Sequence, residues 1–169
     1  MPHPLVLQLR FTRAEFRRGL AGLSEADAQT RVGPMNSISW NVGHLAWQEQ
    51  RYFIYRLQGQ PLPLPRLQEQ FCYGCPPVTP PLAEMWAAWE AVTTASDPFL
   101  DTLTTDLLTA HHPLDNGPDF FTGGNLLQRV IYHYWYHTGE NLAIRQALGH
   151  TDLPEFVGDI DDLAPYTPH

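Results

Sequence analysis

The sequence lacks any stretch expected to cross a membrane or to direct secretion. Its uncharged stretches are interrupted by His, Gln, Asn or Pro, and none approaches the ~20 apolar residues of a membrane-spanning helix. The opening residues, MPHPLVLQLRF, contain no basic segment followed by an apolar core and a small-residue cleavage site. Two cysteines in 169 residues are too few for a disulfide scaffold. We therefore expect a cytoplasmic protein with no membrane partner.

Lysine is also absent, and charge is unevenly distributed along the chain. All ten basic residues are Arg, and eight of them lie in residues 1–66, which carry four acids and a net charge of +4. Residues 67–169 carry two Arg and fourteen acids, a net charge of −12. The one basic group is interpreted as a solvent-exposed helix face. It consists of Arg10, Arg13, Arg17 and Arg18. Without a further basic cluster, the chain is a poor candidate for binding nucleic acid.

What the sequence does contain is helical periodicity, without a credible strand. Apolar residues recur every three or four positions, and a hydrophobic content of 43% suits a single globular domain over residues 1–169. These patterns predict an all-α fold, a four-helix bundle. Pro98 is expected to kink or split the third helix. The acidic, proline-containing tail at 151–169 is expected to lack regular structure. The predicted helices cover approximately residues 4–23, 38–58, 81–105 and 123–148.

The two long connections are predicted to be loops. Residues 59–81 contain seven prolines, a density that excludes a helix because each proline lacks an amide donor and clashes with the preceding turn. Some twenty extended residues span about 60 Å, twice the length of a twenty-residue helix. This proline-rich crossover can therefore return along the bundle and allow the second and third helices to run parallel. Residues 106–121 form the other predicted loop.

Two histidines on the fourth predicted helix have the spacing of metal ligands. His133 and His137 are four residues apart, so their Cβ atoms lie about 5–6 Å apart on one helical face. Two imidazole nitrogens can converge from that spacing on one ion. The alternative is a pair of core histidines satisfied by hydrogen bonds, because H-x3-H alone is weakly specific.

A third histidine, His44, lies on the second predicted helix. Trp40 precedes it by one turn and Trp47 follows it by one turn, which indicates a buried position. Gly43 would let a neighbouring helix or a ligand approach closely. Three inward histidines on two helices form a three-nitrogen site with a fourth position for water or substrate, and such open sites are of the catalytic type. Together they favour a divalent metal site over satisfied core histidines.

Glu140, three residues beyond His137, is the candidate catalytic residue. It is placed to orient a ligand imidazole, to act as a general base, or only to solvate the helix edge. Asn141 and Tyr134 flank the same stripe and are candidate polar contacts in a pocket.

Cys72 and Cys75 form a single C-Y-G-C in the proline-rich crossover. A zinc ribbon needs a second such pair, and a thioredoxin-type site needs a preceding strand and a following helix. Neither is predicted, so the sequence favours two ordinary loop thiols.

With these residues, the chain resembles the DinB-like superfamily of damage-inducible and YfiT-type four-helix bundles. The resemblance rests on S-I-S-W-N-V-G-H-L-A-W in the second helix and H-Y-W-Y-H-T-G-E-N-L-A-I-R-Q-A-L-G-H in the fourth, and it covers most of the chain. It implies an up-down-down-up bundle, a homodimer, and one zinc or nickel ion bound by His44, His133 and His137. The C-Y-G-C is not part of the family pattern.

The resemblance also defines the functional alternatives. Some relatives are transferases or isomerases that use low-molecular-weight thiols such as bacillithiol or mycothiol, and many have no known activity. One hypothesis is a metal-dependent thiol transferase, in which the ion stabilises a thiolate that attacks a small electrophile and Glu140 collects the proton. The alternatives are a non-catalytic metal-binding stress-response bundle, in which the ion ties the second and fourth helices together, and a metal-dependent hydrolase.

Overall fold

Four long helices form the body of the protein in a computed structural model, which describes residues 1–114, 117–155 and 157–166. The mostly helical chain confirms the predicted all-α class. Within the described residues, no helix combines the length and the apolar character needed to cross a bilayer. The long helices are α1 (Pro4–Gly19), α3 (Ile38–Glu49), α5 (Leu82–Leu100) and α7 (Gly123–Ala147).

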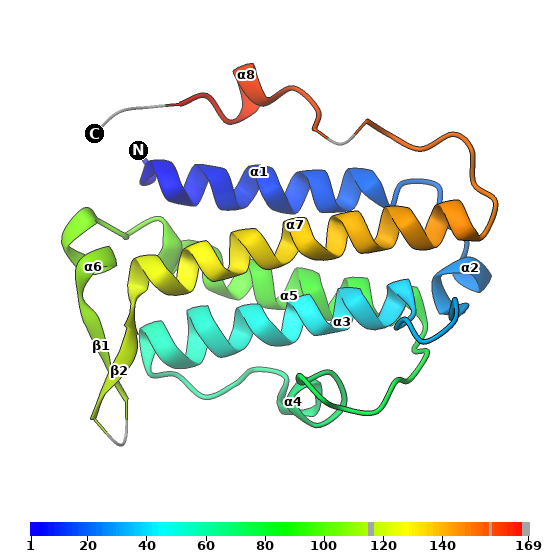
Figure 1. The fold of residues 1–169 in the computed structure, drawn as a ribbon. Helices are drawn as coiled ribbons and strands as arrows, with labels where there is room; N and C mark the ends of the chain where they lie inside the picture. The colour runs from blue at the N-terminus through cyan, green and yellow to red at the C-terminus, as the bar shows by residue number, and fades with distance from the viewer. Residues whose placement is uncertain (115–116, 156, 167–169) are drawn as a thin grey trace.

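The long helices lie side by side (Figure 1). α1 packs against α7, and α3 packs against both α5 and α7. The residue-number colours show that α1 and α7 run in one direction along the bundle, whereas α3 and α5 run in the other. The segment between α3 and α5 returns along the length of α3 and contains a short helix, α4 (Pro65–Gln70).

Shorter elements connect and flank the long helices. Side-chain oxygens cap several helices by accepting a hydrogen bond from a first-turn amide; Ser37 does so for α3 and Thr122 for α7. The remaining elements are α2 (Glu25–Gln29), the π-helix η1 (Gln50–Arg56), α6 (Thr105–Thr109), the strands β1 (His111–Leu114) and β2 (Gly117–Thr122), and α8 (Ile160–Leu163).

One prediction based on proline is wrong, and the structure contradicts part of a second. α4 begins at Pro65, inside the segment predicted to contain no helix. Proline suits the first helical position, where its missing amide is not needed, and the next proline is Pro76. Pro98 lies inside α5 without splitting it. Because Pro98 is in the last turn, the hydrogen bond that it removes lies at the end of the helix, where few bonds remain to be disturbed.

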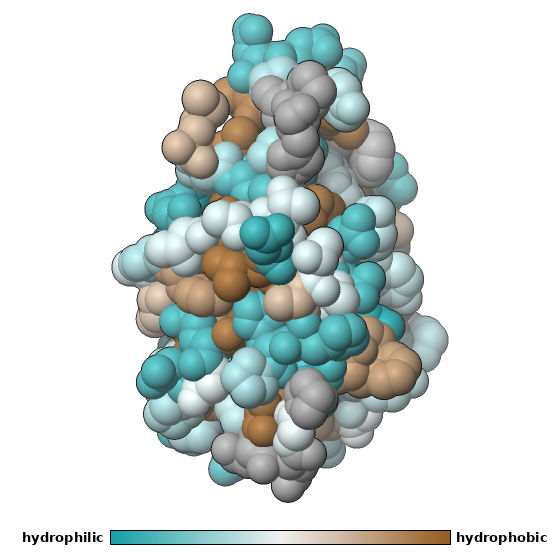
Figure 2. All heavy atoms as spheres, turned by 90° about the vertical axis from the view of Figure 1, so that its left-hand side faces the viewer, coloured by the Kyte–Doolittle hydropathy of each residue, from teal (hydrophilic) through white to brown (hydrophobic). Residues whose placement is uncertain are grey.

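An antiparallel hairpin of β1 and β2 occupies part of the predicted loop 106–121. Asp119 of β2 is buried, and its carboxylate accepts a hydrogen bond from Nε of Arg56 at 2.5 Å. This ion pair holds the hairpin against the end of η1. The hairpin end of the molecule faces the viewer in Figure 2, where hydrophobic residues are interspersed with hydrophilic ones.

α3 continues directly into η1, so the second predicted helix is α-helical in its first part and π-helical in its second. The side-chain amide of Gln50, the first residue of η1, pairs with the backbone of Leu64. Its Nε2 donates to the Leu64 carbonyl at 2.9 Å, and the Leu64 amide donates to its Oε1 at 3.0 Å. This double hydrogen bond fixes the proline-rich crossover against the helix.

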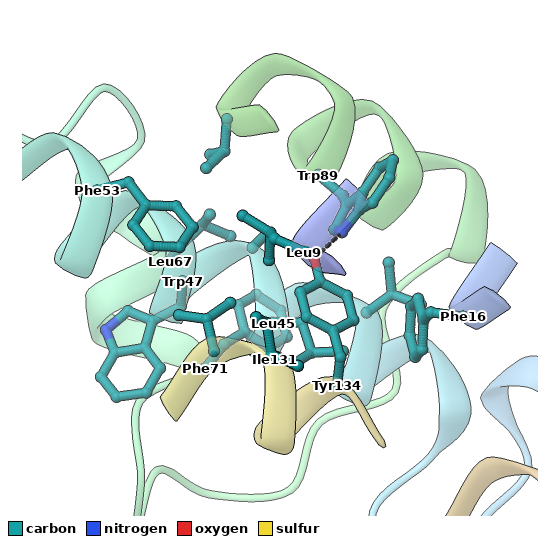
Figure 3. Close-up of a cluster of buried hydrophobic side chains, with 14 of the residues drawn as sticks. Leu9, Phe16, Leu45, Trp47, Phe53, Leu67, Phe71, Trp89, Ile131 and Tyr134 are labelled. Atoms are coloured by element: carbon teal, nitrogen blue, oxygen red, sulfur yellow. Dashed lines mark hydrogen bonds between the residues drawn. The ribbon is translucent and has the colours of Figure 1, made fainter. Parts of the chain in front are cut away.

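The core lies between the four long helices (Figure 3). Tyr134 of α7 is at its centre and fully buried, with the Phe16 ring of α1 packed edge-on against it at 5.3 Å. Nε1 of Trp89 donates to the Tyr134 hydroxyl, which in turn donates to Glu49 of α3 at 2.6 Å. Tyr134 is therefore a core residue that links three helices, and the prediction of a pocket contact is wrong.

Arg13 contradicts the prediction that the Arg group of the first helix is solvent-exposed. Its side chain is buried, and its guanidinium donates to both carboxylate oxygens of Glu49 and to Asp97 of α5. Burial disfavours the charge on Arg13, but the Glu49 carboxylate outweighs burial and raises the pKa of Arg13 above its usual value. Surface ion pairs also join α1 to α5, among them Arg10–Asp97 and Arg17–Glu90, and Arg10 pairs with Asp101 just after α5.

Candidate metal centre

Three histidines meet where α3 packs against α7. His44 lies on α3, and His133 and His137 lie one turn apart on α7. Nε2 of His133 is 3.3 Å from Nε2 of His44 and 3.0 Å from Nε2 of His137. One ligand atom from each of the three lies within 4.8 Å of the other two. The structure thus brings together the three histidines that the sequence singled out.

The spacing of these nitrogens fits a divalent transition metal. At metal–nitrogen distances near 2.0–2.1 Å, two ligands of a tetrahedral ion lie ~3.3 Å apart, and adjacent ligands of an octahedral ion lie ~2.9 Å apart. Both observed Nε2–Nε2 distances, 3.0 and 3.3 Å, fall in this range. The two distances from His133 are therefore those expected for ligands of one ion.

Aromatic rings fix His44 from both sides. Its imidazole stacks on Trp40 with ring centroids 4.7 Å apart and on Trp47 at 5.1 Å, and its side chain is only 5% exposed. Gly43 permits close packing, because a Cβ there would lie 2.6 Å from Sδ of Met85 and 3.0 Å from the Phe71 ring. The absent side chain at Gly43 accommodates these two core residues.

Hydrogen bonds on the far side of two rings set the direction of their lone pairs. Nδ1 of His44 donates to the carbonyl oxygen of Phe71 at 2.6 Å, and Nδ1 of His137 donates to Glu140 at 2.7 Å. A carbonyl oxygen and a carboxylate can only accept, so the protons of the neutral rings are on Nδ1. The Nε2 lone pairs are then directed at the common point, as metal ligation requires.

Burial keeps two of the rings neutral. Burial is the main cause that lowers the pKa of His44 to about 4; the charge of His137 acts in the same direction, and the hydrogen bond to Phe71 acts against it. Burial, followed by the charges of His137 and His44, lowers the pKa of His133 to about 3. Neutral imidazoles are the metal-binding form, so both rings are ready to bind an ion near neutral pH.

Glu140 lies behind His137 and not at the point where the Nε2 atoms meet. Its Oε2 accepts from Nδ1 of His137 and, at 3.0 Å, from the side-chain amide of Asn41. The hydrogen bond from His137 is the main cause that lowers the pKa of the Glu140 carboxyl, which keeps it ionised. Asn41 also donates to Asn141 at 2.7 Å, which gives Asn141 a position beside Glu140.

Two groups of this site are absent from the sequence prediction. Asn41 lies three residues before His44, a spacing that places it on the same side of α3 and that could have identified it. The Phe71 carbonyl is a backbone atom, and no residue type marks it in advance. Both belong to the outer part of the site, where hydrogen bonds orient the imidazoles.

Replacing Glu140 by Gln is expected to weaken zinc binding by about tenfold, because outer hydrogen-bond partners of metal-binding histidines contribute about 10–100-fold in affinity. Competition with a chromophoric chelator measures the change. Glu84→Gln, an exposed position in the first turn of α5, is the matched control and should keep wild-type affinity. Equal affinities of the two variants would show that Glu140 does not support His137.

The cysteines differ from the predicted pair of loop thiols. Cys72 and Cys75 are joined by a disulfide. The physical reason is a tight turn, in which the amide of Cys75 donates to the carbonyl of Cys72 at 3.0 Å and Gly74 adopts a φ of +83°. The turn brings the two Cα atoms to 5.3 Å, within the range that a disulfide bridges.

A known protein family matches most of this sequence. The sequence model of the DinB superfamily matches residues 8–140, a region that includes all three histidines. No curated protein sequence matches the chain.

Proposed function

Because the chain belongs to the DinB superfamily, we propose that His44, His133 and His137 bind one zinc or nickel ion and that the protein transfers a low-molecular-weight thiol to a small electrophile. The observation that carries the proposal is the convergence of three Nε2 atoms from two helices. Three protein nitrogens leave a tetrahedral ion one position for a further ligand, which is the arrangement of catalytic sites.

The residues around the site support this chemistry. A bound divalent ion would supply Lewis-acid stabilisation of a thiolate, the nucleophilic form of a thiol. Trp40 and Trp47 enclose the His44 ring and limit the access of water to that side of the site. Glu140 orients His137; its Oε2 already accepts two hydrogen bonds, which supports a positioning role over that of a general base.

The proposal also includes the topology and the assembly implied by the resemblance. The helix directions in Figure 1 support an up-down-down-up bundle. A homodimer is supported by Tyr132 and Tyr136, which lie one turn apart on α7 with 66% and 68% of their surfaces exposed. Exposed aromatic side chains are enriched where proteins associate.

Two measurements on one preparation test the proposal. Elemental analysis should find about one zinc or nickel ion per chain in the wild type and almost none in His137→Ala. The metal-loaded wild type should then consume bacillithiol or mycothiol in the presence of monochlorobimane, with the fluorescent product as readout, and His137→Ala should not exceed the rate without protein.

The outcomes separate the candidate functions. Metal bound without turnover of any thiol would leave the non-catalytic bundle, in which the ion stabilises the packing of α3 against α7. This structural role is supported by the position of the ligands, because His44 lies on α3 and the other two histidines lie on α7. It predicts that bound metal raises the melting temperature. Turnover of an ester or amide substrate without thiol would favour the hydrolase. A wild type that binds no metal would overturn all three.

A further inference from the structure

The segment before the C-Y-G-C turn packs on the helix that carries His44. Nε1 of Trp47 donates to Oε1 of Gln68 in α4 at 2.7 Å. Phe71, the residue after α4, is 1% exposed and lies against Gly43, with its ring 6.2 Å from that of Trp40. The end of α4 is therefore held on the same side of α3 that presents His44.

The disulfide begins at the peptide group that holds His44. The carbonyl that accepts from Nδ1 of His44 belongs to the peptide bond between Phe71 and Cys72. A peptide unit is planar, so rotation of the backbone at Cys72 moves this carbonyl as part of one rigid group. The conformation of the C-Y-G-C turn and the hydrogen bond to the His44 ring are consequently coupled through a single residue.

The turn is accessible from solvent. Cys72 and Cys75 are each half-buried, and Tyr73 between them is 91% exposed. Besides the sulfur–sulfur bond, a backbone hydrogen bond from Cys75 to Cys72 and the left-handed conformation of Gly74 favour the closed turn. The turn can therefore hold both thiols close enough for the bond to form again after reduction.

We propose that Cys72 and Cys75 are a reversible modification site for low-molecular-weight thiols, and that reduction of their disulfide weakens the hold of Phe71 on His44. In the reaction, an external thiolate attacks one Sγ, the Sγ–Sγ bond breaks, and its electron pair leaves on the other sulfur, which takes up a proton. A second external thiol cleaves the mixed disulfide. Two external thiols are oxidised to one external disulfide, and both cysteines become thiols.

The consequence for the metal centre rests on the proposed function, whereas the modification itself does not. With the disulfide formed, the Phe71 carbonyl keeps the proton of His44 on Nδ1 and the lone pair on Nε2. Without it, the turn gains conformational freedom, and the ring loses part of the support that orients it. The reduced protein binds zinc less tightly than the oxidised protein, by the roughly tenfold factor typical of an outer hydrogen-bond partner.

The test compares oxidised wild type, reduced wild type and the double variant C72S/C75S, which cannot form the bond and has no thiols to bind zinc. Differential alkylation followed by mass spectrometry reports the state of the pair. Chelator competition is expected to give a zinc affinity about tenfold weaker for C72S/C75S than for oxidised wild type. Tyr73→Ala, an exposed position in the same turn, is the matched control and should retain the oxidised affinity.

A second readout does not need metal. Diethyl pyrocarbonate modifies exposed imidazoles, so His44 in the metal-free protein should react several-fold faster after reduction, as quantified in the peptide that contains it. If the oxidised wild type binds no zinc, the proposed function fails, and the reactivity of His44 toward diethyl pyrocarbonate alone tests the inference. If C72S/C75S does not fold, the comparison of His44 reactivity in oxidised and reduced wild type tests it instead. Equal zinc affinity and equal His44 reactivity in both states would overturn it, as would a pair that cannot be reduced and reoxidised.

Discussion

The His133→Ala variant is expected to bind zinc about a hundredfold more weakly than the wild type. Nε2 of His133 contacts both other imidazoles, at 3.3 and 3.0 Å, so its loss removes the central ligand. Structural zinc sites contribute about 10–16 kcal/mol, so one ligand of four corresponds to ~3 kcal/mol, or about two orders of magnitude in Kd. Chelator competition or calorimetric titration measures the affinity.

His133 is also the most informative of the three positions to truncate. Its side chain is half-buried, and its Nδ1 has no hydrogen-bond partner among the described residues. The alanine variant therefore removes polar contacts only within the three-histidine cluster, where Nε2 of His44 and Nε2 of His137 lose their neighbour. Zinc at a concentration that saturates the wild type should raise the melting temperature of the wild type by more than that of the variant. His111→Ala, on the exposed side of β1, is the matched control. Wild-type affinity in His133→Ala would exclude the three-histidine site.

The Glu49→Ala variant is expected to lower the free energy of unfolding by about 3–5 kcal/mol, the usual effect of removing one partner from a buried ion pair. Glu49 is fully buried, and its carboxylate accepts from Arg13 and from the Tyr134 hydroxyl. Its removal leaves the guanidinium of Arg13 in the core without its main counter-charge. For a chain of this size the loss corresponds to roughly 10 °C in melting temperature. Urea unfolding and calorimetry measure both quantities.

An exposed ion pair between α1, the helix that carries Arg13, and α5 provides the control. Arg17 and Glu90 are joined at 2.8 Å, but about half of each side chain is exposed. Glu90→Ala should therefore change the free energy of unfolding by less than ~1 kcal/mol. The double variant R13M/E49L should recover part of the stability lost in Glu49→Ala, since it leaves no charge buried beside an empty position. A small effect of Glu49→Ala alone would indicate that water reaches Arg13.

The inner part of the site is predictable from the sequence, and the outer part is predictable only in part. Four-residue spacing places His133 and His137 on one face of any α-helix, and the tryptophans around His44 indicate its burial. The hydrogen bond to the Phe71 carbonyl depends on how the proline-rich crossover folds back on α3. Hydrophobic spacing contains no information about that path. The disulfide is also not predictable from the sequence, because the C-Y-G-C motif alone does not indicate the turn around Gly74.

The helices are predictable because their apolar stripes are long, but the exceptions have local causes. Arg13 looks like a member of an exposed basic face. Its guanidinium is paired with Glu49 of α3, and only the assembled bundle brings the two side chains together. The hairpin contains Pro113, a residue that weakens any strand signal. Nothing in the residues of η1 marks a π-helix, since its hydrogen-bond pattern is set by the contacts around it.

The π-helical segment makes this protein unequally tolerant of insertions and deletions. Loss of one residue from η1 would rotate and shift the chain that follows, which would move Leu57 from its position in the core. The same loss within residues 59–63 would be absorbed by extended chain. Gln50 of η1 is hydrogen-bonded to the backbone of Leu64, and the chain runs from Leu64 through α4 to the Phe71 carbonyl that contacts His44. The length of η1 is therefore linked to the orientation of His44. Descendants of this sequence are free to change length in the crossover, but not in the helix before it.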